Sequence, residues 1–332
     1  MSFKTFDLAN DVASIVSSIN EVVTISSSIY SNNQNVKFFR NIASASAGPG
    51  YDLGGYWQSA FDASPTSSLS TALFDMTYGY ATSSAVNLPA TPSSSQNEKI
   101  KMYRHFASVL LGNADSTFTI ANASAPECFF IMLKRGIQKD EVKKGATQII
   151  INRTSEQFTA SDEGASTAFK QTVGGDYAPL KYNGTGSEVG QVWYNAGVIV
   201  LADDLCWDTA TAWSGTKNVH QAQMSGNINS VMDGFRTHVD SVAFHNQTNL
   251  YSTIYFARAN NAEFNYSSNP TFVDDNKRIR VTSGSNILQT RSYVTTIGLY
   301  DASDNLLAVA KVNKPVTKSP DNESIFRIRL DY

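Results

Sequence analysis

The sequence predicts an α+β fold that is mainly β-structure in its C-terminal half, with β-sandwich-like domains preceded by an N-terminal helix and an extended irregular segment. Three observations carry this prediction. Apolar residues follow a helical spacing near the N-terminus, small and polar residues dominate residues 41–95, and β-branched and aromatic runs separated by turn residues fill the C-terminal part. We therefore divide the chain into an N-terminal helix and extended assembly segment (1–95), a mixed α/β domain (96–245) and a β-rich C-terminal domain (246–332).

The first predicted element is an amphipathic helix over residues 8–25. Its intrinsic helix propensity is low, because many of its apolar residues are β-branched and lose side-chain freedom in a helix. Such a helix needs a partner surface, which is either the chain's own domain or a bundle with copies of the chain or with a neighbour. The apolar stripe consists of Leu8, Val12, Ile15, Val16, Ile19, Val22 and Val23.

Residues 41–95 are rich in Ser, Ala, Thr, Gly and Pro, yet aromatic residues recur along them, which disordered linkers lack. We expect an extended segment with a helical turn near residues 69–75. Ordering each residue costs about 1–2 kcal/mol of backbone entropy, so the segment needs a large surface to offset that cost. Residues 1–95 are therefore expected to be ordered chiefly by contact with other subunits; the alternative is a strap across the chain's own C-terminal domain. The anchoring rings are Tyr51, Tyr56, Trp57, Phe61, Phe74, Tyr78 and Tyr80.

The middle of the chain contains two predicted helices. Ser95 and Glu98 form an S-x-x-E capping box, an apolar stripe follows, and Gly112 supplies the stop, which together predict a helix over residues 96–111. The second helix is expected over residues 225–239, where apolar residues again recur at helical spacing. These residues are Ile228, Val231, Met232, Phe235 and Val239.

Strands are expected on both sides of a charged loop, at residues 127–134 and 146–152, which predicts a β-hairpin. A second hairpin is expected from residues 190–194 and 197–201. A third follows near the C-terminus, because the turn residues Ala302 to Asn305 lie between two β-branched runs and Leu299-Tyr300 would meet Leu306-Leu307 across them. The C-terminal strands are expected at 253–259, 278–282, 293–300, 306–312 and 324–330.

Composition limits the classes of function. The net charge is −3 and no run of lysines or arginines occurs, so a nucleic-acid interface is not expected. No 18-residue apolar span and no signal peptide are present in the sequence, so we expect synthesis in a cytoplasm and no membrane partner. Cys128 and Cys206 are too few and too isolated for a disulfide framework, so two reduced thiols are expected, one of them buried.

The sequence predicts no metal site. Zinc sites usually place their ligands at short spacings, and here only His238 and His245, seven residues apart, could align if one helix ran through both. Surface or hydrogen-bonded histidines are the preferred interpretation. The groups considered as ligands were His220, His238, His245, Asp203, Asp204, Asp208, Asp233 and Asp240.

Other catalytic and cofactor sites are not expected either. The glycines at 48–50 and 184–186 do not complete a G-x-G-x-x-G loop, and neither a G-x-x-x-x-G-K-[ST] loop nor a G-x-S-x-G elbow occurs. We therefore assign no catalytic, cofactor-binding or metal-binding residue and predict that the chain is not an enzyme. Exposed rings could bind a sugar, although tryptophan in a strand more often belongs to a core or interface. The tryptophans considered are Trp193, Trp207 and Trp213.

The C-terminal third resembles a family of virion structural proteins of tailed bacteriophages, particularly contractile-tailed phages of marine bacteria and cyanobacteria. The resemblance is carried by LYSTIYFARANNAEFNYSSNPTFVD (250–274), SYVTTIGLYDASDNLLAVAKVNKPVTKS (292–319) and the ending FRIRLDY (326–332). The run GQVWYNAGVIVL (190–201) is similar to a hairpin upstream in such proteins. The resemblance covers roughly the last 145 residues, and residues 1–186 have no comparable match.

This resemblance implies a structural subunit located in the tail or baseplate of a virion that is assembled in the cytoplasm of the host bacterium. Its expected partners are other copies of the chain, in a homo-oligomer, and other tail or baseplate proteins. A host-surface adhesin that binds glycans, or a protein that attaches tail fibres, is the alternative.

Overall fold

The computed structural model describes residues 3–26, 37–40, 56–61, 71–83, 92–153, 156–207, 212–214, 217–218, 223, 226–280 and 290–332. The chain forms two compact units. The large unit comprises residues 19–248, and the small unit comprises residues 1–18 together with 249–332. The three-part domain division made from the sequence stays a prediction.

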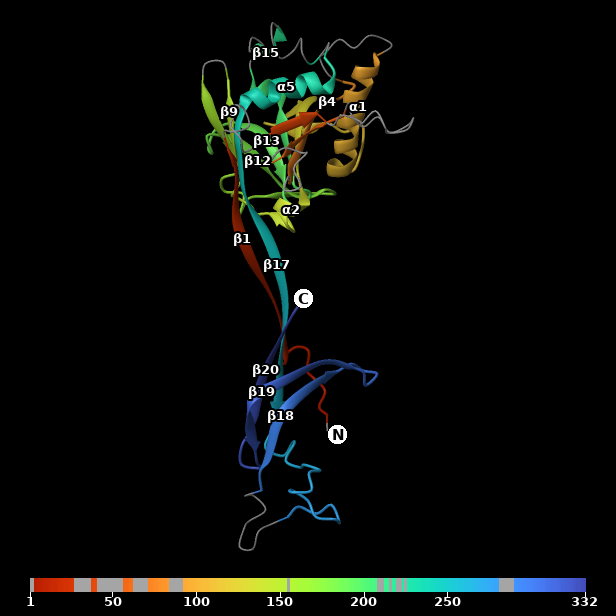
Figure 1. The fold of residues 1–332 in the computed structure, drawn as a ribbon, viewed down its shortest axis with the longest axis vertical. Coiled ribbons are helices and arrows are strands. Elements are labelled where there is room, and N and C mark those ends of the chain that lie inside the picture. Colours follow the sequence, from red (N-terminus) through yellow and green to blue (C-terminus); the bar gives the residue numbers. More distant parts are fainter. Residues whose placement is uncertain are drawn as a thin grey trace. The chain divides into compact units, whose positions relative to one another are not determined.

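The described residues are mostly β-structure with few short helices, so the expected mainly-β class is confirmed (Figure 1). The main sheet is curled and antiparallel, with the order β1-β17-β9-β10-β12-β13-β14-β7-β4-β3-β2, and with β11 on β12 and β8 and β20 on β17. Its strands are β1 (Val12–Ser26), β2 (Lys37–Arg40), β3 (Gln58–Phe61), β4 (Ala72–Tyr80), β7 (Glu127–Leu133), β8 (Glu141–Val142), β9 (Gln148–Asn152), β10 (Gln157–Ser161), β11 (Lys170–Thr172), β12 (Gly175–Tyr182), β13 (Glu188–Trp193), β14 (Val198–Ala202), β17 (Val239–Ala259) and β20 (Ser324–Asp331).

Three two-stranded sheets and five helical segments complete the described structure. The paired strands are β5 (Phe118–Ile120) with β6 (Ala123–Ala125), β15 (Ala212–Ser214) with β16 (Lys217–Asn218), and β18 (Ser292–Tyr300) with β19 (Leu306–Lys318). The helices are α1 (Ser94–Phe106), its π-helical extension η1 (Ala107–Leu111), α2 (Arg135–Gln138), α3 (Asp203–Cys206) and α5 (Ile228–His238).

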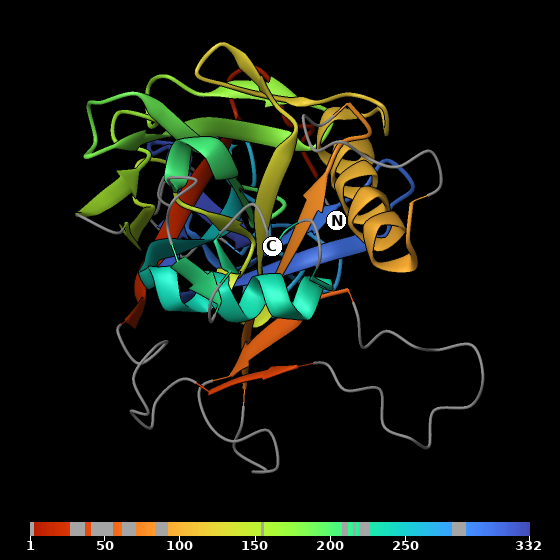
Figure 2. The ribbon, with the colours of Figure 1, turned by 90° about the horizontal axis from the view of Figure 1, so that it is seen from above.

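The centre of the large unit is buried on both faces of the sheet. Neighbouring residues of β7 point to opposite sides, where Phe129 stacks on Phe235 of α5 and Phe130 stacks on Phe106 of α1. The ring centroids are 4.8 Å and 4.1 Å apart, respectively. Figure 2 shows α1 and α5 beside β4, the strand that pairs with β7. A strand covered on both sides needs apolar residues at every position, which explains the continuous apolar run of β7.

Helix α1 lies directly against β4 at Gly79. A Cβ atom at this glycine would lie 2.7 Å from both the Lys99 carbonyl oxygen and the Tyr103 backbone nitrogen. The absence of a side chain therefore lets the helix backbone approach the strand. The helix expected over residues 96–111 is confirmed, but its capping box is Ser93 with Gln96 rather than the expected Ser95 with Glu98.

The predicted end of the first helix, the second helix and the hairpin at residues 190–201 are confirmed. Gly112 ends the first helix with φ 81°, a left-handed conformation that glycine adopts without strain. The helix expected over residues 225–239 is α5, and its N-cap is Asn227, whose side chain accepts from the Ser230 backbone N–H at 2.9 Å. The hairpin expected at 190–201 is the pair β13–β14.

The predicted N-terminal helix is wrong, because β1 occupies most of residues 8–25. Apolar residues stand at both odd and even positions there, so the spacing fits a helix and a two-faced strand equally well. Branched side chains favour the strand, and the sheet partner decides the matter. The Phe256 backbone N–H donates to the Asp11 carbonyl oxygen at 2.8 Å, and the Glu21 N–H donates to Asn246 Oδ1 at 3.1 Å.

Two further expectations are corrected by strand pairing. The strands β7 and β9 exist, but they do not form a hairpin, since β7 pairs with β4 and β14 while β9 pairs with β10 and β17. In the described part of the helical turn expected near residues 69–75, residues 72–75 instead begin β4, which lies between β3 and β7. Strand β4 lies in the chain's own sheet, while the ordering of residues 1–95 by other subunits stays a prediction. Residues 41–55, 62–70 and 84–91 lie outside the described residues.

The small unit contains the C-terminal strands. Residues 252–259 of β17 pair with β20, and β18 pairs with β19. The strands expected at 253–259, 293–300, 306–312 and 324–330 are therefore confirmed. The strand expected at 278–282 is wrong within its described part, where Ile279 forms only an isolated bridge with Val273.

Candidate interaction surface

The hairpin of β18 and β19 is organised by its turn, as the sequence predicts. The Asp301 carboxylate accepts from the backbone N–H groups of Ser303 and Asn305, each at 2.8 Å, and from the Asn305 side chain at 2.9 Å. These hydrogen bonds, that of the Asn305 side chain first, lower the pKa of Asp301. Asp304 adopts φ 62°, a left-handed conformation that aspartate tolerates.

One face of this hairpin presents apolar side chains to solvent. Gly298 stands opposite Val309, and a Cβ atom at Gly298 would lie 2.8 Å from Cε2 of Tyr300 and 3.2 Å from Cδ1 of Leu306. The Tyr300 ring and Leu306 therefore lie over the bare backbone of Gly298. Tyr300, Leu306 and Val309 remain about half exposed, whereas Leu299 points the other way and is buried.

The outer edge of β19 is open. Among the described residues, β19 pairs with β18 alone, and no backbone hydrogen bond leaves residues 306–316 for another segment. Residues 306–310 (LLAVA) carry no charge, and Leu307 is 68% exposed. An uncharged, apolar strand edge with unpaired backbone groups is a template for pairing with another chain.

In the part of the small unit that the structure describes, more large apolar side chains are exposed than are buried. The buried hydrophobic residues are Ile254, Ala259, Val273, Leu299 and Ile328. The exposed large ones are Phe3, Leu8, Ile15, Val16, Tyr251, Tyr266, Tyr293, Tyr300, Leu306, Leu307, Val309, Ile325 and Tyr332. Contiguous exposed apolar patches mark interaction sites in soluble proteins, whereas singly exposed apolar residues are common.

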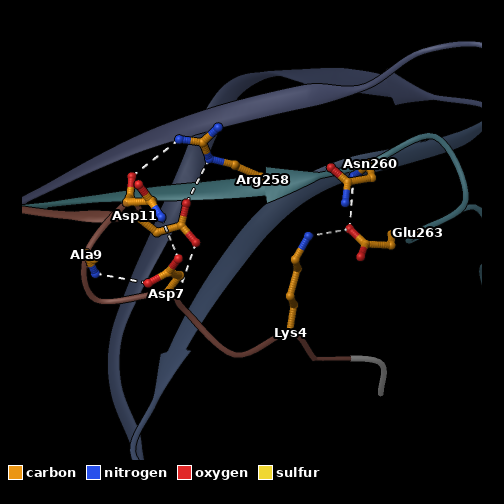
Figure 3. Close-up of polar contacts among 8 residues, drawn as sticks. Lys4, Asp7, Ala9, Asp11, Arg258, Asn260 and Glu263 are labelled. Carbon is orange, nitrogen blue, oxygen red and sulfur yellow. Dashed lines mark hydrogen bonds and ion pairs between the residues drawn. The ribbon is translucent and has the colours of Figure 1, made fainter.

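The N-terminal residues are fastened to the small unit by ion pairs (Figure 3). Lys4 Nζ lies 2.8 Å from Glu263 Oε2, and Arg258 Nε lies 2.7 Å from Oδ1 of Asp11. The hydrogen bond from Lys4 is the largest cause of the lowered pKa of Glu263. Asp7 receives the side-chain amide of Asn10 at 2.6 Å, which lowers the pKa of Asp7. Together with the Phe6 ring, whose centroid lies 5.5 Å from that of Tyr255, these polar contacts hold residues 3–11 in place.

A buried lysine ties the end of β19 to neighbouring loops. Lys318 is fully buried, and its ammonium group donates to the carbonyl oxygens of Asn261, Ser319 and Asn322 and to Oδ1 of Asn265, at 2.8–3.2 Å. Burial lowers the pKa of Lys318. Four oxygens around one ammonium satisfy a charge that would otherwise be costly to bury.

The large unit contains a separate buried polar cluster of Tyr78, Tyr80, Lys99, Asp203 and Gln223. Lys99 Nζ lies 5.9 Å from the centre of the Tyr80 ring and donates to the Gln223 carbonyl oxygen. Burial lowers the pKa of Lys99 to about 8, raises that of Tyr80 to about 12 and raises that of Asp203 to about 8. Among the described residues, Asp203 Oδ1 and both phenolic oxygens have no hydrogen-bond partner. All five side chains are buried, so the cluster presents no reactive group to solvent.

The histidines considered as metal ligands are not brought together by α5. The helix ends at His238, whose Nδ1 lies 2.9 Å from the Gly234 carbonyl oxygen, and β17 begins at the next residue, so His245 stands on a strand. Asp203 belongs to the buried cluster, while Asp204 is exposed. Within the described residues, no three His, Cys, Asp or Glu side chains gather as metal ligands. Asp240 stands at the start of β17 and is half-buried. Asp208, His220 and the side chain of Asp233 lie outside the described residues.

The tryptophans considered as sugar platforms belong to the core where they are described. Trp193 is fully buried and stacks on Tyr177, and Trp207 is 3% exposed, whereas the side chain of Trp213 lies outside the described residues. Cys128 and Cys206 are free, and both are buried, not one as expected.

The exposed surface formed by Tyr300, Leu306, Leu307 and Val309 is not among the predictions from the sequence. Its signal was present, because Gly298 interrupts a strand-like run and an interior glycine often marks a place where a ring covers the backbone. The buried lysines carry no such signal, since neither Lys99 nor Lys318 differs in its sequence context from a surface lysine.

Within the described parts of the chain, no helix is long and apolar enough to cross a membrane. Comparison with protein-family models, with curated proteins and with solved structures finds no match for the chain.

Proposed function

We propose that this chain is a structural subunit of a tailed bacteriophage virion, located in the tail or baseplate, that acts through subunit–subunit contacts. Its partners are other copies of itself and other tail or baseplate proteins, and it assembles in the cytoplasm of the host bacterium. In this proposal the chain is not an enzyme, needs no cofactor and does not bind nucleic acid or a membrane.

The observation that carries the proposal is the outward placement of apolar side chains on the small unit. Among its described residues, thirteen large hydrophobic side chains are exposed and five hydrophobic residues are buried. Contact with other subunits would remove these side chains from water, which contributes about 25 cal/mol for each Å² of apolar surface.

The resemblance to virion proteins lies in the same part of the molecule and supports the same proposal. The matching runs at residues 250–274, 292–319 and 326–332 all belong to the small unit. We further propose that this unit is sandwich-like, with the β18–β19 hairpin packed on β17 and β20, since the buried Leu299, Ile254 and Ile328 come from these two strand pairs.

The exposed tyrosines favour a second candidate, a host-surface protein that binds glycans, because sugars stack on exposed rings. Those of the small unit are Tyr251, Tyr266, Tyr293, Tyr300 and Tyr332. Binding of the purified chain to an array of bacterial surface glycans, lost in a Tyr293→Ala, Tyr300→Ala variant, would favour this candidate.

The test of the first proposal uses purified particles of the phage that encodes the chain. Mass spectrometry should find the chain in particles at a stoichiometry of several copies, and immunogold electron microscopy should label the tail or baseplate. Recovery of the chain only in the soluble fraction of the lysate, with none in particles, would contradict the proposal.

A further inference from the structure

We infer that two copies of this chain associate through the outer edge of β19, strand to strand and antiparallel, to form a four-stranded sheet with the order β18-β19-β19-β18. This inference rests on the proposed function and names the surface and the partner through which the chain would self-associate. The occupant of the edge is a second copy of the same strand.

The edge of β19 can accept a strand along a defined stretch. Residues 306–310 are uncharged and have no backbone partner beyond β18 among the described residues. Natural edge strands usually avoid this combination by means of lysine, proline or a bulge. Lysine and proline occur only after this stretch, at Lys311, Lys314 and Pro315. The register with β18 shifts at two places, one at Leu306–Ala308 opposite Leu299 and Tyr300 and one opposite Val294 and Thr296, so the stretch from Ala308 to Lys311 is the regular part of the edge.

The charges around this stretch select an antiparallel pairing with the same strand. The turn before β19 is acidic, with exposed Asp304, and the residue after the apolar stretch is the exposed Lys311. A parallel pairing would set like charges beside one another. An antiparallel pairing sets the lysine of each copy beside the acidic turn of the other, and a two-fold axis makes that contact twice.

The charges at the two ends of the apolar stretch also fix the register between the two β19 strands. If Ala308 lies opposite Ala308 of the second copy, residues 306–310 oppose themselves, Val309 opposes Leu307, and Lys311 opposes Asn305 beside Asp304. A shift by one residue would exchange the two faces of the strand and separate the charges. Because the two-fold contact uses the same edge in both copies, it closes as a dimer and leaves no β19 edge for growth into a fibre.

The first test measures the mass of the purified full-length chain by sedimentation equilibrium between about 1 and 100 µM. This range suits a weak dimer, because an edge contact buries less than the roughly 800 Å² per partner of a standard interface. We expect a reversible dimer. Val309→Lys places a charge at the centre of the edge and should weaken association at least tenfold. Ile325→Lys, at a similarly exposed apolar residue of β20, is the matched control and should leave the dimer unchanged.

The second test examines the charge pairing. In the native background Asp304→Asn should weaken the dimer, because Lys311 loses its partner. In a Lys311→Glu background the same Asp304→Asn change should strengthen it, because a repulsion is removed. A reversal of sign indicates direct coupling, which an effect on folding alone does not produce. An effect of the same sign in both backgrounds would overturn the register.

The third test examines geometry by cross-linking. Ala308→Cys should form an intermolecular disulfide on mild oxidation, whereas Val312→Cys, which would face Asp304 of the second copy, should not. The native thiols are both buried and do not compete. Equal cross-linking of the two variants, or a monomer throughout the concentration range, would overturn the inference. A monomer that is nonetheless found in particles would overturn it while leaving the proposed function intact.

Discussion

Two ionisable side chains of the large unit, Lys99 and Asp203, are buried, and burial brings both of their pKa values to about 8. The unfolded aspartate loses its proton near pH 4, while the folded one keeps it until about pH 8. The folded state therefore binds an extra proton throughout this window. Its stability relative to unfolded chains must fall as the pH rises through the window.

We expect Asp203→Asn to become progressively more stabilising, relative to the native chain, between about pH 4 and pH 8. The limiting slope for one proton is about 1.4 kcal/mol per pH unit. Urea unfolding at several pH values measures the difference in unfolding free energy between the variant and the native chain. Asp204→Asn, at the exposed neighbouring residue, is the control, and it should not reproduce the slope. A difference that is constant with pH would contradict the burial of a neutral Asp203.

Lys318 should be more important for stability than its neighbours on β19. Lys318→Met keeps the length of the side chain but leaves four oxygens without their donor, so we expect a loss of about 3 kcal/mol in the unfolding free energy of the small unit. Lys314→Met, at an exposed residue of the same strand, should change it by less than about 0.5 kcal/mol. Chemical denaturation followed by near-UV circular dichroism measures both. Equal effects would show that the oxygen cage is not important.

Elements that depend on local signals were predicted well, and elements that depend on distant partners were not. The helices α1 and α5 have caps and stripes within their own residues, and the β18–β19 hairpin has its turn. The pairing of β1 with β17 joins residues more than two hundred positions apart, so no spacing within residues 8–25 could reveal it. The absence of a β7–β9 hairpin has the same cause.

The candidate surface was only partly predictable for a related reason. Alternation in β18 and β19 separates two sets of side chains, but which set is covered depends on the packing of other strands. Leu299 is buried and Tyr300 is about half exposed, although both are large apolar residues next to one another in sequence.

The close contact between α1 and β4 leaves no room for a side chain at Gly79. Gly79→Ala should destabilise the large unit by about 1–3 kcal/mol, because the new methyl group would meet helix backbone atoms that cannot move separately from the helix. Gly136→Ala, where a Cβ atom would have no neighbour within 4 Å, is the control and should be nearly neutral. Thermal and urea unfolding measure both variants. An equal response would mean that α1 can shift away from the strand.

For the whole molecule, the two units differ in how they are stabilised. The large unit has extended cores on both faces of its sheet. The described residues of the small unit include few buried apolar ones, and ion pairs, the hydrogen bonds of Lys318 and backbone pairing contribute to its stability. We therefore expect two thermal transitions in scanning calorimetry. The midpoint temperature of the small unit's transition should rise with protein concentration, because association stabilises the folded state. The corresponding gain in unfolding free energy is up to about 1.4 kcal/mol for each tenfold increase in concentration. Transitions that are both independent of concentration would contradict association through this unit.

The two thiols have a consequence for the chemical environments that the fold tolerates. Cys128 and Cys206 are buried, each within 3.4 Å of a backbone carbonyl oxygen, and burial raises the pKa of both. The reactive form of cysteine is the thiolate, so these groups resist oxidants and disulfide exchange while the chain is folded. Both thiols of the folded chain should therefore stay reduced when the surrounding solution changes from reducing to oxidising.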